Sequence, residues 1–186
     1  MFFMKKICFL LMTVLTALTG CMFAGRSSKP VKEYDLALLG KPVPQQSFYI
    51  SSFSSEAPAK HRMLYRKNQN IIEQDPYNNW IQRPENMLSR YFRQMFPLTG
   101  GAQISGLIEV RASVTAFEID LTDAEAVLGL YVTLKRQNVR KSFSLNIREK
   151  VSARTPDAFA QAMSKAAWRA GEAIKADVER FAAAKE

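Results

Sequence analysis

Hydrophobic and polar residues alternate most regularly in the second half of the chain. Apolar side chains take every second position over three stretches, 108–116, 117–121 and 126–134. This period of two predicts strands with one apolar and one polar face. The phase slips between Ala116 and Phe117, which predicts a β-bulge. A further strand is predicted at 139–151, after a tight turn at Gln137–Asn138. Together these strands form an antiparallel meander.

Two other stretches change to the helical period. The first begins at Pro84, since proline is favoured at the first position of a helix, and ends before Pro97. Its apolar stripe consists of Met87, Leu88, Tyr91, Phe92, Met95 and Phe96. The second helix has Thr155 as its cap and Pro156 as its first residue, and runs to about Ala183. Its many alanines allow close packing on a sheet, and Gly171 is its one weak position.

Shorter alternating stretches in the first half predict shorter strands. These stretches are 33–39, 47–53, 62–67 and 70–74. In the second of them Phe48 and Ile50 share one face, and Tyr49 and Phe53 share the other. The whole pattern predicts an α/β fold of the α+β type. It consists of an antiparallel-rich mixed sheet with two main helices packed on it.

The N-terminus has the three-part layout of a secretory signal peptide. Lys5 and Lys6 precede an almost wholly apolar stretch, 7–18, and the sequence Leu18-Thr19-Gly20-Cys21 follows. The apolar stretch is too short to span a hydrocarbon core of about 30 Å. A cleavable signal at 1–20 is therefore expected rather than a transmembrane helix.

The sequence Leu-Thr-Gly-Cys also matches the lipobox of bacterial lipoproteins, which predicts lipidation of Cys21. Acyl chains contribute about 0.8 kcal/mol per buried methylene, and two or more chains anchor a protein stably. The alternative is an ordinary secretory signal with an incidental cysteine. If Cys21 is lipidated, residues 21–32 form a lipidated tether and residues 33–186 form one domain. Met22 stands where an aspartate would favour inner-membrane retention, so the outer membrane is expected.

Basic residues outnumber acidic ones, 26 Lys+Arg against 17 Asp+Glu. Removal of the signal takes two lysines away and leaves a net charge of 24 − 17 = +7. This excess suits an anionic membrane surface, and no nucleic-acid partner is expected for an exported lipoprotein. Seven basic residues of the meander are either a solvated surface or a surface for an acidic partner or lipid headgroups. They are Arg111, Lys135, Arg136, Arg140, Lys141, Arg148 and Lys150.

The residue inventory predicts neither an enzyme nor a cofactor or metal site. His61 is the only histidine, and Cys8 leaves with the signal, so zinc ligands are lacking. No Gly-x-Ser-x-Gly elbow or Gly-rich phosphate loop is present. Glu73 and Asp75 are a possible carboxylate pair, although such pairs are common at strand ends. The apolar stripe of the first helix is either core or a lipid-contacting groove.

Several motifs between residues 62 and 96 are the most individual part of the chain. They are Met63-Leu64-Tyr65-Arg66, Tyr77-Asn78-Asn79-Trp80 and Arg83-Pro84-Glu85-Asn86-Met87-Leu88. With the lipobox, the early Tyr34-Asp35-Leu36, the long alternating strands and the Ala-rich last helix, they follow one order. In this order the chain resembles the ABC-type transport auxiliary lipoproteins of the paraquat-inducible protein C type.

The resemblance implies a domain similar to the TolB N-terminal domain and a non-enzymatic role in envelope lipid transport. The implied partners are a mammalian-cell-entry (MCE) domain protein and an inner-membrane transporter component. A ring of identical copies is also implied. Tyr77 and Trp80 are either packing residues or anchors of a partner interface. The alternative function is that of a structural lipoprotein, which scaffolds an envelope assembly or secretion complex.

Overall fold

The computed structural model describes residues 29–45, 47–99, 104 and 106–184. The chain divides into two units, Met1–Pro30 and Val31–Glu186. The predicted signal peptide, the lipobox and Cys21 lie outside the described residues. Within the described part, no helix is long and apolar enough to cross a membrane.

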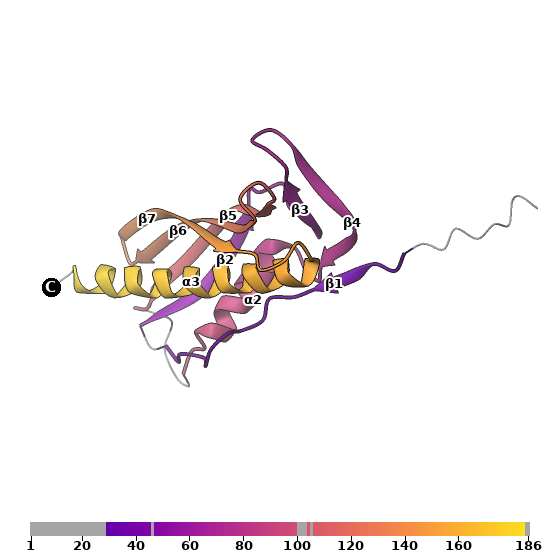
Figure 1. Cartoon of the computed structure of the whole chain (residues 1–186). Helices are drawn as coiled ribbons and strands as arrows, with labels where there is room; N and C mark the ends of the chain where they lie inside the picture. The colour runs from indigo at the N-terminus through magenta and orange to yellow at the C-terminus, as the bar shows by residue number, and fades with distance from the viewer. Residues whose placement is uncertain (1–28, 46, 100–103, 105, 185–186) are drawn as a thin grey trace, which may run out of the picture. The chain divides into compact units, whose positions relative to one another are not determined.

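The described part of Val31–Glu186 contains a seven-stranded sheet and two helices (Figure 1). The strands are β1 (Lys32–Tyr34), β2 (Phe48–Ser55), β3 (Arg62–Arg66), β4 (Ile72–Trp80), β5 (Ile108–Asp120), β6 (Glu125–Arg136) and β7 (Val139–Lys150). The helices are α2 (Pro84–Met95) and α3 (Pro156–Ala183). The strand order is β1-β4-β3-β5-β6-β7, and β2 also pairs with β5. The predicted fold class is therefore confirmed, whereas similarity to TolB stays a prediction.

The sheet is mixed because two short strands share one edge of β5. β2 pairs parallel with the stretch from Ile108 to Val114, and β3 pairs parallel with Ile119 and Asp120. β2 and β3 thus lie end to end along β5. On the other edge, β5, β6 and β7 form the predicted antiparallel meander.

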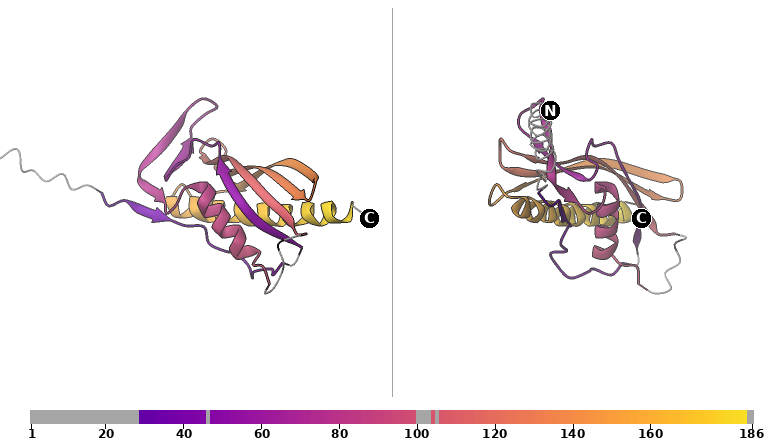
Figure 2. Two further views of the ribbon diagram at one scale, coloured as in Figure 1. Left: turned by 180° about the vertical axis from the view of Figure 1, so that it is seen from behind. Right: turned by 90° about the vertical axis from the view of Figure 1, so that its right-hand side faces the viewer.

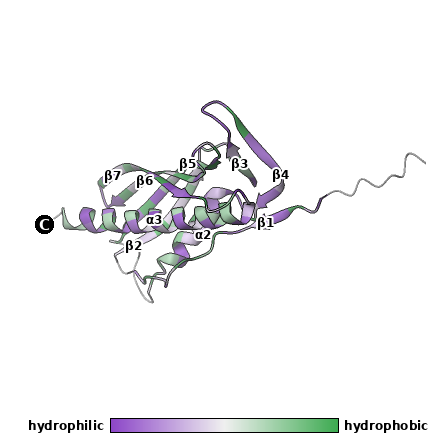
Figure 3. Ribbon diagram, viewed as in Figure 1, coloured by the Kyte–Doolittle hydropathy of each residue, from purple (hydrophilic) through white to green (hydrophobic). Residues whose placement is uncertain are grey.

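Both helices cover the same face of the sheet (Figure 2). Directly after α2, Phe96 lies 5.2 Å from Phe48 of β2, ring centre to ring centre. On α3, Phe159 lies 5.4 Å from Tyr65 of β3. Hydrophobic residues gather on β5 and β6, and they alternate with polar residues along α3 (Figure 3). The opposite face, which we call the open face, is not covered by a helix of the described chain.

The apolar stripe of α2 lies in the core. Met87, Leu88, Phe92 and Met95 are all fully buried. α2 and α3 approach closely at Gly171, where an added Cβ would lie 2.4 Å from the sulfur of Met95. The stripe is therefore core rather than a lipid groove, and the glycine predicted to weaken α3 makes room for α2.

A bulge is confirmed just before the predicted position at Ala116–Phe117, and a glycine lies opposite it. The register of β5 on β6 shifts between Val114 and Ala116, so Thr115 is the extra residue. A Cβ at Gly129 of β6 would lie 2.5 Å from the hydroxyl oxygen of Thr115 and 3.0 Å from the nitrogen of Ala116. Glycine at this position lets the bulged strand pass close to β6.

The first predicted strand is mostly wrong. β1 ends at Tyr34, and residues 35–39 leave the sheet. The amide of Ala37 donates instead to the hydroxyl of Ser164 on α3, at 3.0 Å. The predicted apolar face is still recognisable, because Leu36 is buried while Ala37 is exposed. This segment packs on α3, so its residues still alternate between buried and exposed positions, but it forms no hydrogen-bond ladder with another strand.

Two details of the next strands also differ from the predictions. The register of β2 shifts after Ile50, which brings Phe53 to the helix-covered face. Phe53 stacks there on Phe92, with ring centres 5.5 Å apart. β4 continues to Trp80, well past the predicted end at 74. A register shift in its pairing with β3 accommodates Pro76, since a bulge tolerates the missing N–H of proline.

Candidate functional site

The open face of the sheet carries most of the predicted basic cluster. Antiparallel pairing places Glu109 beside Lys135 and Lys135 beside Arg140. Further along the same face, Tyr131 lies opposite Ser144 and is 47% exposed. Two members of the predicted set point the other way. Lys141 reaches Asp177 of α3 at 3.0 Å, and Arg136 alternates with Lys135 along β6.

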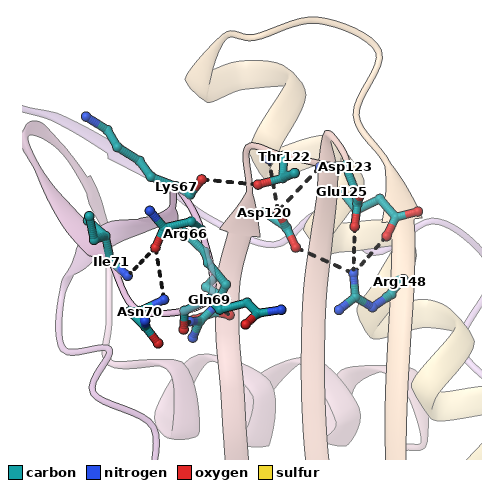
Figure 4. A network of polar contacts seen from close by, with 12 residues as sticks. Arg66, Lys67, Gln69, Asn70, Ile71, Asp120, Thr122, Asp123, Glu125 and Arg148 are labelled. Atoms are coloured by element: carbon teal, nitrogen blue, oxygen red, sulfur yellow. Dashed lines mark hydrogen bonds and ion pairs between the residues drawn. The ribbon is translucent and has the colours of Figure 1, made fainter.

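One end of the open face holds a dense group of ion pairs (Figure 4). We call it the charge cluster; its members are Arg66, Glu118, Asp120, Asp123, Glu125, Arg148 and Lys150. Arg66 of β3 donates two hydrogen bonds to Glu118 of β5, at 2.5 and 3.0 Å. This two-bond geometry fixes the guanidinium and carboxylate planes together, and it raises the pKa of Arg66.

Arg148 of β7 is the centre of the cluster. Its guanidinium lies 3.1 Å from Glu125, 3.6 Å from Asp120 and 3.7 Å from Asp123. Lys150 reaches the other oxygen of Glu125 at 3.1 Å. Hydrogen bonds from Arg148 and Lys150 lower the pKa of the Glu125 carboxyl. The cluster therefore joins β3, β5, β6 and β7 by charged side chains.

Two turns complete the surroundings of the cluster. Thr122 donates its hydroxyl to the carbonyl of Lys67 at 3.1 Å and its amide to Asp120 at 2.9 Å. In the β3–β4 turn, the side-chain oxygen of Asn68 accepts from the amides of Asn70 and Ile71, both at 2.9 Å. A cavity of about 530 Å³ lies between these turns and the cluster. The polar groups around the cavity form hydrogen bonds and ion pairs with one another, which favours a structural role for this cluster.

The described residues contain no group of three His, Cys, Asp or Glu side chains that could hold a metal ion. Glu73 and Asp75, the possible carboxylate pair, have separate partners. Glu73 pairs with Lys67 at 2.6 Å. Asp75 accepts from the Tyr65 hydroxyl at 2.6 Å and from two backbone amides. His61 is exposed, and its carbonyl accepts from the amide of Trp80.

The end of the sheet at the β6–β7 turn is basic, and its cations lack such pairing. We call Lys135, Arg136 and Arg140, at the β6–β7 turn, the basic tip. Among the residues that the structure describes, these three have no carboxylate within 4.0 Å. The nearby Glu109 is held by Arg111 at 2.8 Å. Lys135 and Arg140 lie directly opposite each other, an arrangement of like charges that destabilises a sheet.

The two predicted interface residues are in very different environments. Trp80 is 2% exposed, and its ring centre lies 5.1 Å from that of Phe117. It is thus a core residue, as the packing interpretation requires, and not an interface anchor. Tyr77 is 43% exposed, so its role in a partner interface stays a prediction.

The charge cluster is the feature that sequence reasoning missed. Arg66 and Glu118 are far apart in the chain, and only the parallel pairing of β3 with β5 brings them together. The sequence signal in β5 was weak, because Glu118 and Asp120 fall on the regular polar positions of an alternating strand and only the structure shows that they are buried. The sequence also did not show which cations would meet them. The predicted basic cluster is thereby divided, because Arg148 and Lys150 belong to the charge cluster.

Comparisons with known proteins identify the fold. No family model and no curated protein matches the chain. An uncharacterized protein of known structure has a TM-score of 0.67 and 12% identity, and the match covers 81% of this chain and 99% of that one. Protein XCC0632 from Xanthomonas campestris, labelled with the family name DUF330, has a TM-score of 0.57 and 14% identity, over 77% and 92%. Neither description states an activity, so what is shared with these proteins is the fold.

Proposed function

We propose that this protein is a non-catalytic lipoprotein of a trans-envelope, MCE-type lipid transport system. In this proposal Cys21 carries the acyl chains that hold it at the outer membrane. The domain then docks the end of the transport conduit there. The observation that carries the proposal is the sequence Leu18-Thr19-Gly20-Cys21, followed by a domain whose charged surface is divided between two ends.

The positions of β1 and the basic tip at opposite ends of the domain support a docking role. β1 lies beside the start of α3, where Asp157 is in the first turn (Figure 1). Lys141, near the basic tip, contacts Asp177 of the same helix. These two positions on α3 are separated by about 30 Å, given the rise of 1.5 Å per residue. β1 and the basic tip are therefore at opposite ends of the helix (Figure 1).

The tether length relates these ends to a membrane. The chain from Cys21 to Val31 spans at most about 35 Å when extended. In the proposal, β1 lies at the membrane-proximal end and the basic tip faces the periplasm. An acidic partner approaching from the periplasm would then meet the tip first, since charge complementarity steers encounter.

Affinity purification of the full-length protein from envelopes tests the proposal. With Cys21 intact, we expect an MCE-domain protein and an inner-membrane transporter component in the eluate, identified by mass spectrometry. Palmitate labelling should disappear in the Cys21→Ala variant, which should fold normally but recover less of the partner. Deletion of the gene should weaken the outer-membrane barrier against detergents.

The outcome also separates the scaffold alternative. If the lipidated protein recovers only assembly or secretion components, it is a scaffold lipoprotein and not part of a lipid transporter. Recovery of no transport component with Cys21 intact contradicts the proposal directly. Palmitate labelling that persists in the Cys21→Ala variant contradicts the assignment of Cys21 as the lipidated residue.

A further inference from the structure

The edge strands of the sheet differ greatly in length. β1 has three residues, β2, which pairs only with β5, has eight, and β7 is the longest with twelve. β7 pairs with β6 in unbroken register and contains neither proline nor a bulge. Edge strands are normally shortened, bulged or covered, because their free N–H and C=O groups attract other strands. β7 has none of these protections except its charged side chains.

The free backbone groups of β7 can be assigned to particular residues. The carbonyl of Arg148 accepts from the Arg169 side chain at 3.5 Å and therefore points away from β6. Backbone groups alternate in direction along an antiparallel strand. The N–H and C=O groups of Arg140, Ser142, Ser144 and Asn146 therefore point outward as well. Among the described residues they have no hydrogen-bond partner, so only the end of β7 beside α3 is covered.

The charges around this open stretch select its partner. Arg140 starts it, and Lys135 and Arg136 flank it across the β6–β7 turn. From Ser142 to Ile147 the strand carries no charge. A second copy of the chain would offer the same uncharged stretch, Ser142 to Ile147, and would leave the tip without a counter-charge. An acidic strand would neutralise the tip and satisfy the free backbone groups.

We infer that the stretch Val139–Asn146 binds an extended acidic segment of a partner protein, which adds a strand to the sheet. Such strand addition draws its affinity from backbone hydrogen bonds and its specificity from alternate side chains. Carboxylates of the segment would lie at the basic tip, and apolar side chains would lie beside Phe143 and Leu145, which are half-buried. The inference rests on the proposed function, since it names the docking surface.

A synthetic peptide tests the inference on the full-length protein in detergent micelles. The probe is an alternating Val-Glu octapeptide, and the control is the same peptide with Lys in place of Glu. We expect the acidic peptide to bind in a titration followed by fluorescence anisotropy. Hydrogen exchange should slow at the amides of Ser142, Ser144 and Asn146. The Lys peptide should not bind.

Ser144→Pro tests the backbone contribution. It removes one outward N–H, and proline is tolerated at such a position in an edge strand. Binding should weaken about tenfold, as expected for the loss of a backbone hydrogen bond and a disturbed edge. Ser144→Ala is the matched control and should bind within about twofold of wild type.

A double variant, Lys135→Glu with Arg140→Glu, tests the charge contribution. Reversal of both charges should weaken binding by at least about tenfold at low salt. Lys165→Glu, an exposed change on α3, is the control and should leave binding unchanged. Circular dichroism and thermal unfolding check the fold of each variant. If Ser144→Pro fails to fold, the double variant together with exchange at the three amides decides the matter.

Four results would overturn the inference. They are no binding of the acidic peptide to wild type, unchanged binding by Ser144→Pro, binding only to phosphatidylglycerol vesicles, and self-association that Ser144→Pro abolishes. The last two would assign the edge to a membrane or to a second copy. Failure of the proposed function is separable: the peptide then binds as expected, but no MCE-domain protein is recovered from envelopes.

Discussion

In the charge cluster, Arg66, Arg148 and Lys150 each lie within 3.1 Å of a carboxylate oxygen. In the basic tip, no described carboxylate lies within ion-pair distance of Lys135, Arg136 or Arg140. Both groups occupy the same sheet, and both connect neighbouring strands. The first group therefore contributes to the fold, while the second works against it by repulsion.

The surroundings of the two groups differ as well. The cluster lies at the end of the sheet where α3 begins. The Arg154 side chain there donates to the carbonyl of Leu121 at 3.3 Å, and Trp80 packs on Phe117 in the core below. The tip residues flank a two-residue turn with a left-handed residue, Gln137 at φ 53°. Changes in the cluster region should therefore affect stability, and changes at the tip should affect binding.

Trp80→Ala should give the largest effect, because it removes a fully buried side chain at the cluster end. We expect the free energy of unfolding to fall by about 3–5 kcal/mol, as for other buried aromatic residues. Tyr77→Ala, three residues earlier and half-exposed, should change it by only about 0.5 kcal/mol. Urea denaturation measures both. A loss at Trp80 no larger than that at Tyr77 would contradict its place in the core.

Glu118→Gln should give the next largest effect. The Glu118 side chain is 8% exposed, and its loss of charge leaves the half-buried guanidinium of Arg66 without its carboxylate. We expect a cost of about 1–3 kcal/mol. Arg140→Gln at the tip should cost nothing in the same denaturation experiment. Equal costs at the two positions would remove the contrast between cluster and tip.

These contrasts explain what the sequence could and could not predict. Strands β5, β6 and β7, the bulge at Thr115 and both helices follow from local periodicity. Local periodicity depends only on residues near in sequence, so these elements can be predicted without knowing the strand order of the sheet. The bond between Arg66 and Glu118 depends on β3 lying beside β5, which no local pattern encodes. For the same reason, the sequence does not show that Arg148 and Lys150 have carboxylate partners whereas Lys135 and Arg140 have none in the described chain.

Two predictions for the short strands were wrong for a related reason. Residues 35–39 alternate like a strand, but their amides meet α3 and not another strand, as the bond of Ala37 to Ser164 shows. In β2, the shift after Ile50 changes the face of Phe53 because Phe92 offers an aromatic contact. Burial decides these positions, and burial depends on which elements meet.

Acid should destabilise the protein through its engaged carboxylates. Burial of Asp75 opposes ionisation, but hydrogen bonds from Tyr65, Tyr77 and Asn78 outweigh it and lower its pKa from the ordinary 3.8. The pKa of Glu125 is likewise below its ordinary 4.5. A carboxyl with a lowered folded-state pKa stabilises the fold above its unfolded pKa. That contribution is lost as the pH falls through the folded value.

The free energy of unfolding should therefore fall below a pH of about 4.5. The double variant Asp75→Asn with Glu125→Gln should show a flatter pH profile, measured by urea denaturation between pH 3 and pH 7. Arg140→Gln serves as the control and should keep the wild-type slope. A double variant with an unchanged slope would mean that other carboxyls carry the acid sensitivity.

The smallest effects should differ in sign between the two ends. Lys150→Gln breaks an exposed ion pair with Glu125 and should cost up to about 1 kcal/mol. Arg140→Gln relieves the repulsion with Lys135, the residue directly opposite it, and should gain about 0.2–1 kcal/mol. Both changes should shrink in about 1 M salt, where the screening length falls to about 3 Å. A loss of stability in Arg140→Gln would mean that this tip cation serves the fold. A gain would mean that folding alone disfavours this charge, as expected if a partner uses it.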